Sequence, residues 1–244
     1  MISEIKIAMN KSTVRHTQKS STTTHQTIKI MAFAVIFISY TVTANNGENV
    51  STVSDNQWRP AKQKNGITSY TRNVALSKYK AVKGEATLPV STARLFAAIN
   101  DAPACPEWAD TCKESYIHQE ISAHEFFIYT LNDLPWPVMD RDVVANVSWS
   151  LEDDGAIVMR SRAVKNKVPL NKGVVRIELA TAQWRFKPLT NNSTAASFEI
   201  HMDPNGKIPS WLLNRLILNS PFSTFDNLAK QAAKDKYADA VLPF

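Results

Sequence analysis

The stretch His201-Met-Asp-Pro-Asn-Gly-Lys-Ile-Pro-Ser-Trp-Leu-Leu-Asn-Arg-Leu-Ile-Leu218, followed by a run without glycine as far as Tyr237, decides the fold. Its segment Asp203–Gly206 predicts a turn, because proline presets φ and glycine tolerates positive φ. Pro209 suits the first turn of a helix, where a missing N–H costs nothing. The residues that follow therefore predict one long helix near the C-terminus.

Apolar residues recur along this helix at close to helical spacing, opposite polar and charged ones. Pro221 should kink the helix, because it removes one backbone hydrogen bond and crowds the preceding turn. A helix of about 25 to 30 residues is long for a globular domain, so its apolar stripe must lie on another element. The expected stripe is Leu212, Leu216, Phe222, Phe225, Leu228 and Ala232.

Most of the chain before this helix predicts β-strands. From Lys113 onward, strands follow one another through turns such as Asp153-Asp154-Gly155 with no intervening helix, which indicates an antiparallel meander. A helix capped by Ser91 or Thr92 precedes the meander. The predicted fold class is α+β, with one long amphipathic helix held against a curved antiparallel sheet. Residues 58–64 are a possible first strand or a helix end, and the expected strands are 66–74, 79–88, 116–121, 125–131, 142–151, 157–164, 174–187 and 195–202.

The charge of the chain gives little support to nucleic-acid binding. The formal net charge is +6 over 244 residues. Residues 1–44 contribute five Lys or Arg and one Glu, which leaves 23 basic and 21 acidic residues in the remainder. A nearly neutral body without a Lys/Arg-rich run has no electrostatic footprint for nucleic acid.

The N-terminal residues predict export. Residues 1–28 are polar and basic, residues 30–38 are all apolar, and Val42-Thr43-Ala44 has the small residues of a signal-peptidase site. We expect a signal peptide over 1–44, with the true start at Met1, at Met9 or later, and a periplasmic or secreted protein. The alternative is an uncleaved anchor formed by residues 30–44. Residues 45–57 predict a disordered linker, and 58–244 the folded domain.

The segment Asp133–Asp142 interrupts two expected strands with a protruding loop. Its two prolines remove backbone donors and prevent regular pairing. Trp136 stands between Pro135 and Pro137, so it is held stiffly. It either plugs the core or acts as a hydrophobic gate over the mouth of a cavity.

These segments resemble a known family. Leu134-Pro135-Trp136-Pro137 with Asp140-Arg141-Asp142-Val143-Val144, then Gly173–Arg176 with Trp184, and finally Asp203–Leu212 resemble the blocks of START domains, the StAR-related lipid-transfer family. The resemblance covers about residues 58–237. It implies the helix-grip fold, in which a curved antiparallel sheet wraps a long C-terminal helix around an internal apolar cavity. It also implies one bound lipid, with loop 134–139 and the C-terminal helix gating access. We expect no cofactor and no metal.

The side chains expected to line such a cavity lie on the inner face of the sheet and along the helix stripe, although ordinary core packing explains each of them equally well. Arg176 is a possible headgroup contact, with Glu178 on the same strand face as a possible partner. The charged pair that some family members present to a sterol hydroxyl is not matched near Thr130, Val147 or Ser148. The expected lipid-binding residues are Trp136, Val147, Met159, Ile177, Phe198, Leu212, Leu216 and Phe222.

The two cysteines, Cys105 and Cys112, are a possible disulfide, because an exported chain meets an oxidising compartment. In a continuous helix they would lie about 10 Å apart, too far to bridge, but the break at Pro106 permits a turn that brings them together. Two reduced structural thiols are the alternative. Two cysteines without a nearby histidine do not form a zinc pattern.

Three functions remain open at this point. The leading hypothesis is a monomeric, non-catalytic protein that binds or transfers a lipid and makes transient contact with a membrane. A second is a cyclase- or hydrolase-type enzyme of the helix-grip superfamily, similar to the aromatase/cyclases and acting on an apolar substrate. The third is an accessory protein that uses the loop and the helix to bind a membrane or a partner. The sequence contains no HExxH, GxSxG, P-loop or GxGxxG motif.

Overall fold

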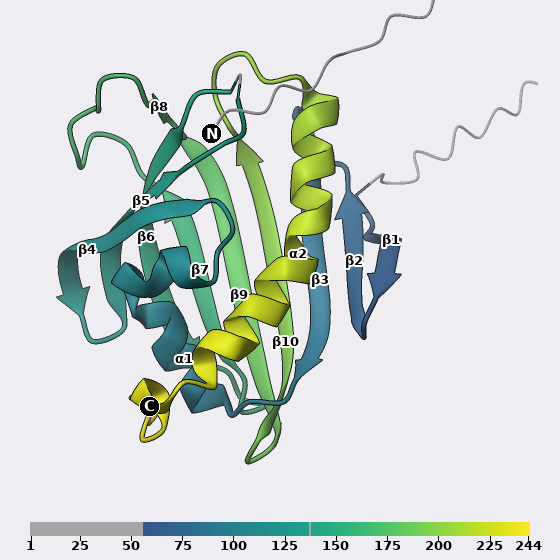
Figure 1. Cartoon of the computed structure of the whole chain (residues 1–244), viewed down its shortest axis with the longest axis vertical. Coiled ribbons are helices and arrows are strands. Elements are labelled where there is room, and N and C mark those ends of the chain that lie inside the picture. The colour runs from purple at the N-terminus through teal and green to yellow at the C-terminus, as the bar shows by residue number, and fades with distance from the viewer. Residues whose placement is uncertain (1–55, 137) are drawn as a thin grey trace, which may run out of the picture. The chain divides into compact units, whose positions relative to one another are not determined.

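The computed structural model describes residues 56–136 and 138–244. The expected leader and nearly all of the expected linker therefore lie outside the described residues. Within the described part the chain forms an α+β fold, in which helix α2 runs across one face of a curved antiparallel sheet (Figure 1). The elements are β1 Arg59–Lys64, β2 Ile67–Arg72, β3 Ala81–Leu88, α1 Thr92–Asn100, η1 Ala102–Glu107, β4 Cys112–Ser122, β5 Glu125–Asn132, β6 Arg141–Leu151, β7 Ile157–Ala163, β8 Val175–Arg176, β9 Leu179–Thr190, β10 Ser193–Asp203, α2 Ser210–Ala232 and η2 Asp235–Tyr237.

The sheet confirms the predicted meander. In the described part its strand order is β1-β2-β3-β10-β9-β7-β6-β5-β4, so neighbouring strands are consecutive in the chain everywhere except at β3–β10 and where β8 is skipped. The short strand β8 lies off this path and pairs with β6 in parallel. Helix α1, whose N-cap Ser91 accepts a hydrogen bond from the backbone N–H of Arg94, carries the chain from β3 to the other end of the sheet.

Two details of the predicted strands are wrong. The expected strand 174–187 is two strands, because the pairing of Arg176 with β6 ends β8 before β9 begins at Leu179. Strand β9 also continues past Pro188 to Thr190. Proline is tolerated there because the position is next to the hairpin, where the register between β9 and β10 shifts.

Helix α2 is shorter than expected, at 23 residues, and it changes direction about halfway along (Figure 1). The bend coincides with Pro221, whose missing N–H leaves the carbonyl of Ile217 without its helical donor. The hydroxyl of Ser220 donates to this carbonyl at 3.0 Å. The break in the hydrogen-bond ladder is therefore repaired locally, and the helix continues to Ala232.

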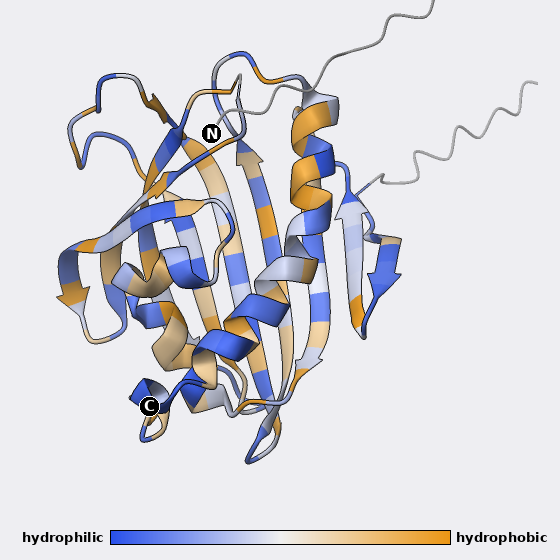
Figure 2. Ribbon diagram, in the orientation of Figure 1, coloured by the Kyte–Doolittle hydropathy of each residue, from blue (hydrophilic) through white to orange (hydrophobic). Residues whose placement is uncertain are grey.

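The buried side of α2 differs from the predicted stripe in its first half. The buried residues are Leu213, Ile217, Pro221, Phe225, Leu228, Gln231 and Ala232. Leu212 is half-buried and Leu216 is exposed, whereas the predictions for Phe225, Leu228 and Ala232 are confirmed. Figure 2 shows hydrophobic residues on the viewer's side of the N-terminal half of the helix, with hydrophilic ones between them. Since Leu213 and Ile217 are buried on another side, periodicity alone did not select the buried side.

Candidate functional site

An aromatic cluster fills the space between the C-terminal half of α2 and the middle of the sheet. Trp184 lies at its centre, with its ring centroid 4.5 Å from that of Phe198 and 5.4 Å from that of Phe186. Phe225 of α2 meets the same indole edge-on at 5.6 Å. These rings are in contact with one another, so the interior at this level is packed in the structure and the internal cavity remains a prediction.

A second apolar cluster lies under the beginning of α2. It consists of buried side chains from β3 and the segment before it, from the segment before α2, and from α2 itself. Leu134 and Val138 from the loop between β5 and β6 pack against it. We define the mouth as the described residues of this loop, 133–136 and 138–140, together with the turn of residues 203–209. The buried members of the second cluster are Tyr79, Val82, Ile208, Leu213 and Ile217.

The structure brings some of the predicted lining residues together and leaves others apart. Val147, Met159, Phe198 and Phe222 belong to, or pack against, the aromatic cluster between sheet and helix. Ile177 is buried just after β8, outside both clusters. The remaining predicted residues, Leu212, Leu216 and Trp136, are half-buried or exposed.

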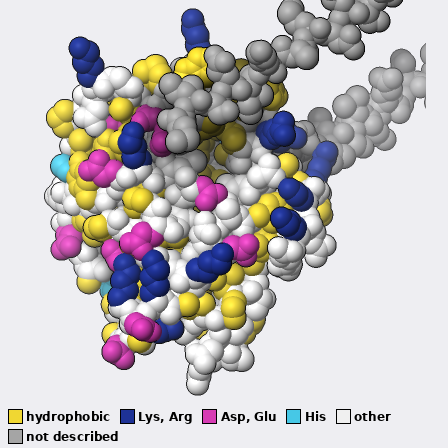
Figure 3. Space-filling view, viewed as in Figure 1, with side chains coloured by type: hydrophobic (Ala, Val, Ile, Leu, Met, Phe, Trp, Pro, Cys, Tyr) yellow, Lys and Arg dark blue, Asp and Glu magenta, His cyan; other side chains and the backbone are white. Residues whose placement is uncertain are grey.

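Large apolar side chains are exposed around the mouth. Trp136 is 92% exposed in the loop, and Trp211 is 66% exposed in the first turn of α2. Met139 and Leu216 are exposed as well. At this end of the molecule hydrophobic side chains reach the surface, and cationic side chains project beside them (Figure 3). Trp136 is therefore a surface residue in the structure and does not plug the core.

Arg176, the predicted headgroup contact, is engaged elsewhere. Its guanidinium forms a two-pronged ion pair with Asp142, at 2.6 and 2.9 Å, and donates to the carbonyls of Val168 and Pro169 at 3.1 Å. The Asp142 carboxylate raises the pKa of Arg176. Glu178 pairs with Lys165 instead of with Arg176. Side chains along a strand point alternately to the two faces of the sheet. Asp142 and Val147 are an odd number of residues apart on β6, and Val147 faces α2, so this ion pair lies on the face of the sheet opposite α2.

A second buried arginine, Arg141, was missed by the sequence analysis. It lies on the inner face of β6 and is 3% exposed. Its guanidinium donates to three backbone carbonyls, those of Met139, Pro204 and Asn205. Burial lowers the pKa of Arg141, but a guanidinium stays charged at neutral pH. The only signal in the sequence was the adjacent pair Arg141-Asp142, in which one residue must face inward.

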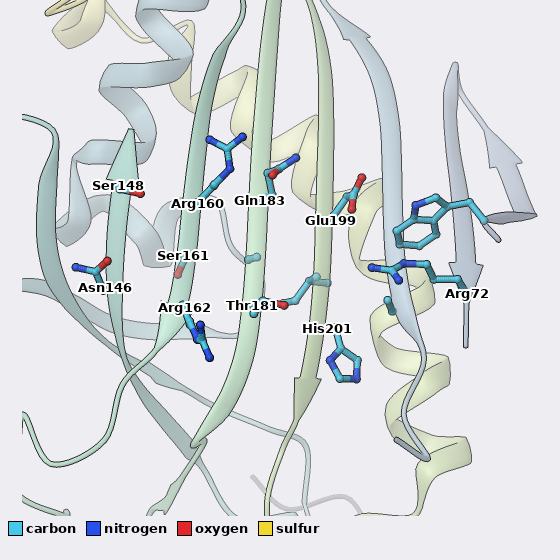
Figure 4. A pocket seen from close by; sticks show the side chains of 14 residues that line it. Arg72, Asn146, Ser148, Arg160, Ser161, Arg162, Thr181, Gln183, Glu199 and His201 are labelled. Atoms are coloured by element: carbon cyan, nitrogen blue, oxygen red, sulfur yellow. The ribbon is translucent and has the colours of Figure 1, made fainter. Parts of the chain in front are cut away.

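A polar hollow of about 350 Å³ lies on the face of the sheet opposite α2 (Figure 4). Arg162 and Glu199 point into it, and neither has an ion pair within residues 56–136 and 138–244. Arg160, which also lines it, is held by Glu152 at 3.0 Å. Burial lowers the pKa of His201, also in its wall, so this imidazole is neutral at pH 7. The hollow is separate from the apolar interior, because the sheet stands between them.

A disulfide and a set of hydrogen bonds hold the segments on either side of η1 in place. Cys105 and Cys112 form a disulfide that joins η1 to the start of β4, with Cα atoms 5.9 Å apart. At the C-terminal end, Lys236 and the Tyr237 hydroxyl donate to the Asp101 carboxylate at 2.9 and 2.8 Å. Burial alone would raise the pKa of Asp101, but these two hydrogen bonds lower it below its ordinary value.

Among the described residues, no group of three or more His, Cys, Asp or Glu could hold a metal ion. The helices of the described part also include none that is long and apolar enough to cross a membrane.

Comparison with known proteins agrees with this architecture. The model of the START domain family matches residues 44–230. An uncharacterised protein from Pseudomonas aeruginosa is 30% identical over 177 residues, which span 72% of this chain and 87% of that protein. A solved STAR-related lipid transfer protein from Xanthomonas axonopodis is 33% identical, covers 72% of this chain and 99% of its own, and superposes with a TM-score of 0.67. Human StAR-related lipid transfer protein 5 is 19% identical over 72% of this chain and 86% of its own, and its TM-score of 0.66 shows the same fold.

The family match spans more than half of the chain, and the strand order, the kinked C-terminal helix and the loop before β6 agree with it. The name of the Xanthomonas axonopodis relative states lipid transfer, and together with the family match this supports a lipid-binding role. The chain belongs to the START domain family and has the helix-grip fold.

Proposed function

We propose that this protein binds a single lipid between α2 and the inner face of the sheet and carries it through the cell envelope. The observation that carries the proposal is the apolar interior, built from two hydrophobic clusters and closed at one end by the loop and the turn of the mouth. Each methylene group moved from water into such an interior gains about 0.8 kcal/mol. The transfer of an acyl chain therefore offsets part of the side-chain contacts that are lost on uptake.

Uptake requires the interior to rearrange, because rings such as Trp184 and Phe225 are in contact across it. The joint at Pro221 is where α2 can bend with the least loss of backbone hydrogen bonds. The N-terminal half of the helix and loop 133–140 pack on the second cluster and not on the aromatic one. We infer that a lipid enters through the mouth as these two segments separate.

The exposed apolar side chains at the mouth support a transient membrane contact. Trp136 and Trp211 come from the two segments that would have to separate. Tryptophan favours the membrane–water interface, where its ring is apolar and its N–H meets water. Contact with a bilayer would place the mouth at the source of the lipid.

Export of the protein is part of the same proposal. The disulfide between Cys105 and Cys112 supports an oxidising compartment, because cytosolic thiols are kept reduced. The basic and apolar pattern of residues 1–44 is the second support. N-terminal sequencing of the mature protein from its source tests this part, and a chain that still begins within residues 1–9 contradicts cleavage near Ala44.

The main experiment is native mass spectrometry of the protein purified from its source, followed by extraction and identification of what is bound. The expected result is a single lipid per chain. Protein that is folded, carries nothing, and takes up neither fatty acid nor phospholipid nor sterol from vesicles would contradict the proposal. The membrane contact is tested separately by vesicle co-sedimentation of Trp136→Ser/Trp211→Ser, with Leu189→Ser, an exposed apolar residue near the β9–β10 hairpin, as the matched control.

A further inference from the structure

We propose that Arg141 is a positioning residue that latches the mouth closed, and that release of this latch sets the rate of lipid exchange. The inference rests on the proposed function, since a latch needs something to release. The backbone of Arg141 is fixed in β6, where it pairs with Asn132 of β5 on one side and with Val175 of β8 on the other. Only its side chain reaches the moving segments.

One guanidinium joins both segments of the mouth. Its Nη1 donates to the carbonyl of Met139 in the loop. Its Nε donates to the carbonyl of Pro204 at 3.4 Å, and its Nη2 to that of Asn205 at 3.3 Å, both in the turn that precedes α2. These carbonyls belong to segments more than 60 residues apart in the chain. Arg141 therefore holds the loop and the turn against the same strand.

The acceptors of Arg141 make this a releasable contact. All three are neutral carbonyls, and the described residues provide no carboxylate in an ion pair with Arg141. A guanidinium buried against carbonyls gives up hydration that a carboxylate partner would repay more fully. When the mouth opens, both the guanidinium and the carbonyls regain water. The closed state is therefore only modestly favoured by this contact.

Arg176 provides the comparison within the same fold. It is also buried, but its charge is matched by Asp142 through two hydrogen bonds, on the opposite face of the sheet. Opening the mouth does not require this pair to break. The charge of Arg176 thus stabilises the sheet, whereas the charge of Arg141 holds the mouth.

Few other polar contacts hold the turn in place. The side-chain amide of Asn205 donates to the carbonyl of Arg176 at 3.3 Å, and the Tyr79 hydroxyl donates to that of Ile208 at 3.4 Å. Their lengths equal those of the two bonds that Arg141 makes to the turn, but neither of these donors is charged and neither also reaches the loop. Without the guanidinium, the carbonyl of the buried Pro204 would lose its partner in the closed state and regain water in the open one, and the loop and the turn would lose the group that joins them, so the balance shifts toward opening.

The test compares Arg141→Met with Arg176→Met by stopped-flow fluorescence. The probe is a nitrobenzoxadiazole-labelled phosphatidylcholine moving between vesicles of phosphatidylcholine and phosphatidylglycerol. We expect Arg141→Met to exchange the probe at least tenfold faster than the wild type, with equilibrium loading within about twofold. Arg141→Lys keeps the charge but loses the planar fork, so its rate of probe exchange should lie between those of the wild type and Arg141→Met. Arg176→Met should lower stability without accelerating exchange.

Hydrogen exchange gives a readout that needs no lipid. In Arg141→Met, backbone amides of residues 133–140 and 203–209 should lose protection together, while those of β7, β9 and β10 before residue 203 keep it. Unchanged protection at the mouth overturns the latch, and so does equal acceleration of lipid exchange in the two methionine variants. If Arg141→Met does not fold, Arg141→Lys carries the same readouts. A wild type that takes up no probe contradicts the proposed function for this lipid. The protection of backbone amides against hydrogen exchange still decides whether Arg141 is a latch.

Discussion

The contact between β3 and α2 makes a sharp prediction about Gly84. This residue lies on the inner face of β3, opposite the kink of the helix. A Cβ atom built on Gly84 would lie 2.6 Å from Cβ of Pro221 and 2.7 Å from Cε2 of Phe225. Ordinary carbon–carbon contacts are about 3.5–4.0 Å, so the added methyl is about 1 Å too close to two groups. Neither neighbour can rotate away easily, because one is a helix proline and the other is a fully buried ring.

The substitution Gly84→Ala should therefore push the middle of α2 away from the sheet. Overpacking a core by one methyl costs about 1–3 kcal/mol, and with two rigid neighbours we expect the upper half of this range. For a domain of this size, about 2–3 kcal/mol corresponds to a melting temperature lower by about 4–12 °C. Thermal unfolding followed by circular dichroism measures the loss. Native-state hydrogen exchange should place the loosening at residues 217–228 of α2.

Gly66→Ala is the matched control. Gly66 has a φ of +75° and open space around its missing side chain, so alanine there is strained without overpacking. Its left-handed backbone should cost about 1–2 kcal/mol and leave exchange in α2 unchanged. A Gly84→Ala variant as stable as the wild type, or one that loosens α2 no more than Gly66→Ala, would refute the close approach of helix and strand.

Three further predictions follow from contacts around the helices. Ser220→Ala should leave the carbonyl of Ile217 unpaired and lower the free energy of unfolding by about 0.5–1.5 kcal/mol, measured by urea denaturation against Ser223→Ala. Asp101 has a lowered pKa in the folded protein, so its stabilising contribution is present above about pH 4 and is lost as the pH falls through the folded pKa. The variant Asp101→Asn should therefore be less stable than the wild type at pH 7. In acid-unfolding curves, its free energy of unfolding should fall less below pH 4 than that of the wild type. The double change Cys105→Ala/Cys112→Ala should cost about 2–3 kcal/mol by loop entropy, and if unfolding were instead unaffected by the change, the loop would be fixed by other contacts.

Most of the fold could be predicted because its signals are local. Alternation along the strands and the turn residues Asp153–Gly155 predict the meander from β4 to β10 without any knowledge of tertiary contacts. The helix, its start near Pro209 and its kink at Pro221 follow from proline chemistry alone. The predicted strand 174–187 deviates in two places, at the break after Arg176 and next to the hairpin beyond Pro188.

The register of α2 could not be predicted in the same way. Between Trp211 and Leu218 apolar residues surround the helix, so 3.6-residue periodicity is satisfied by Leu212 and Leu216 as well as by Leu213 and Ile217. The choice is made by what the helix touches, namely the second cluster under the mouth. Exposed apolar side chains such as that of Trp211 weaken the pattern from which burial is predicted.

The adjacent residues Arg141 and Asp142 show how much depends on alternation along one strand. Asp142 faces outward, and its carboxylate accepts two hydrogen bonds from Arg176 on the outer face of the sheet. Arg141 faces inward, cannot reach that carboxylate, and turns to the backbone of the mouth. A shift of β6 by one residue would exchange the two faces and place an unmatched carboxylate among carbonyl oxygens, which would repel it. The register of β6, and not the identity of the two residues alone, thus determines that the mouth of this START domain is held by a cation.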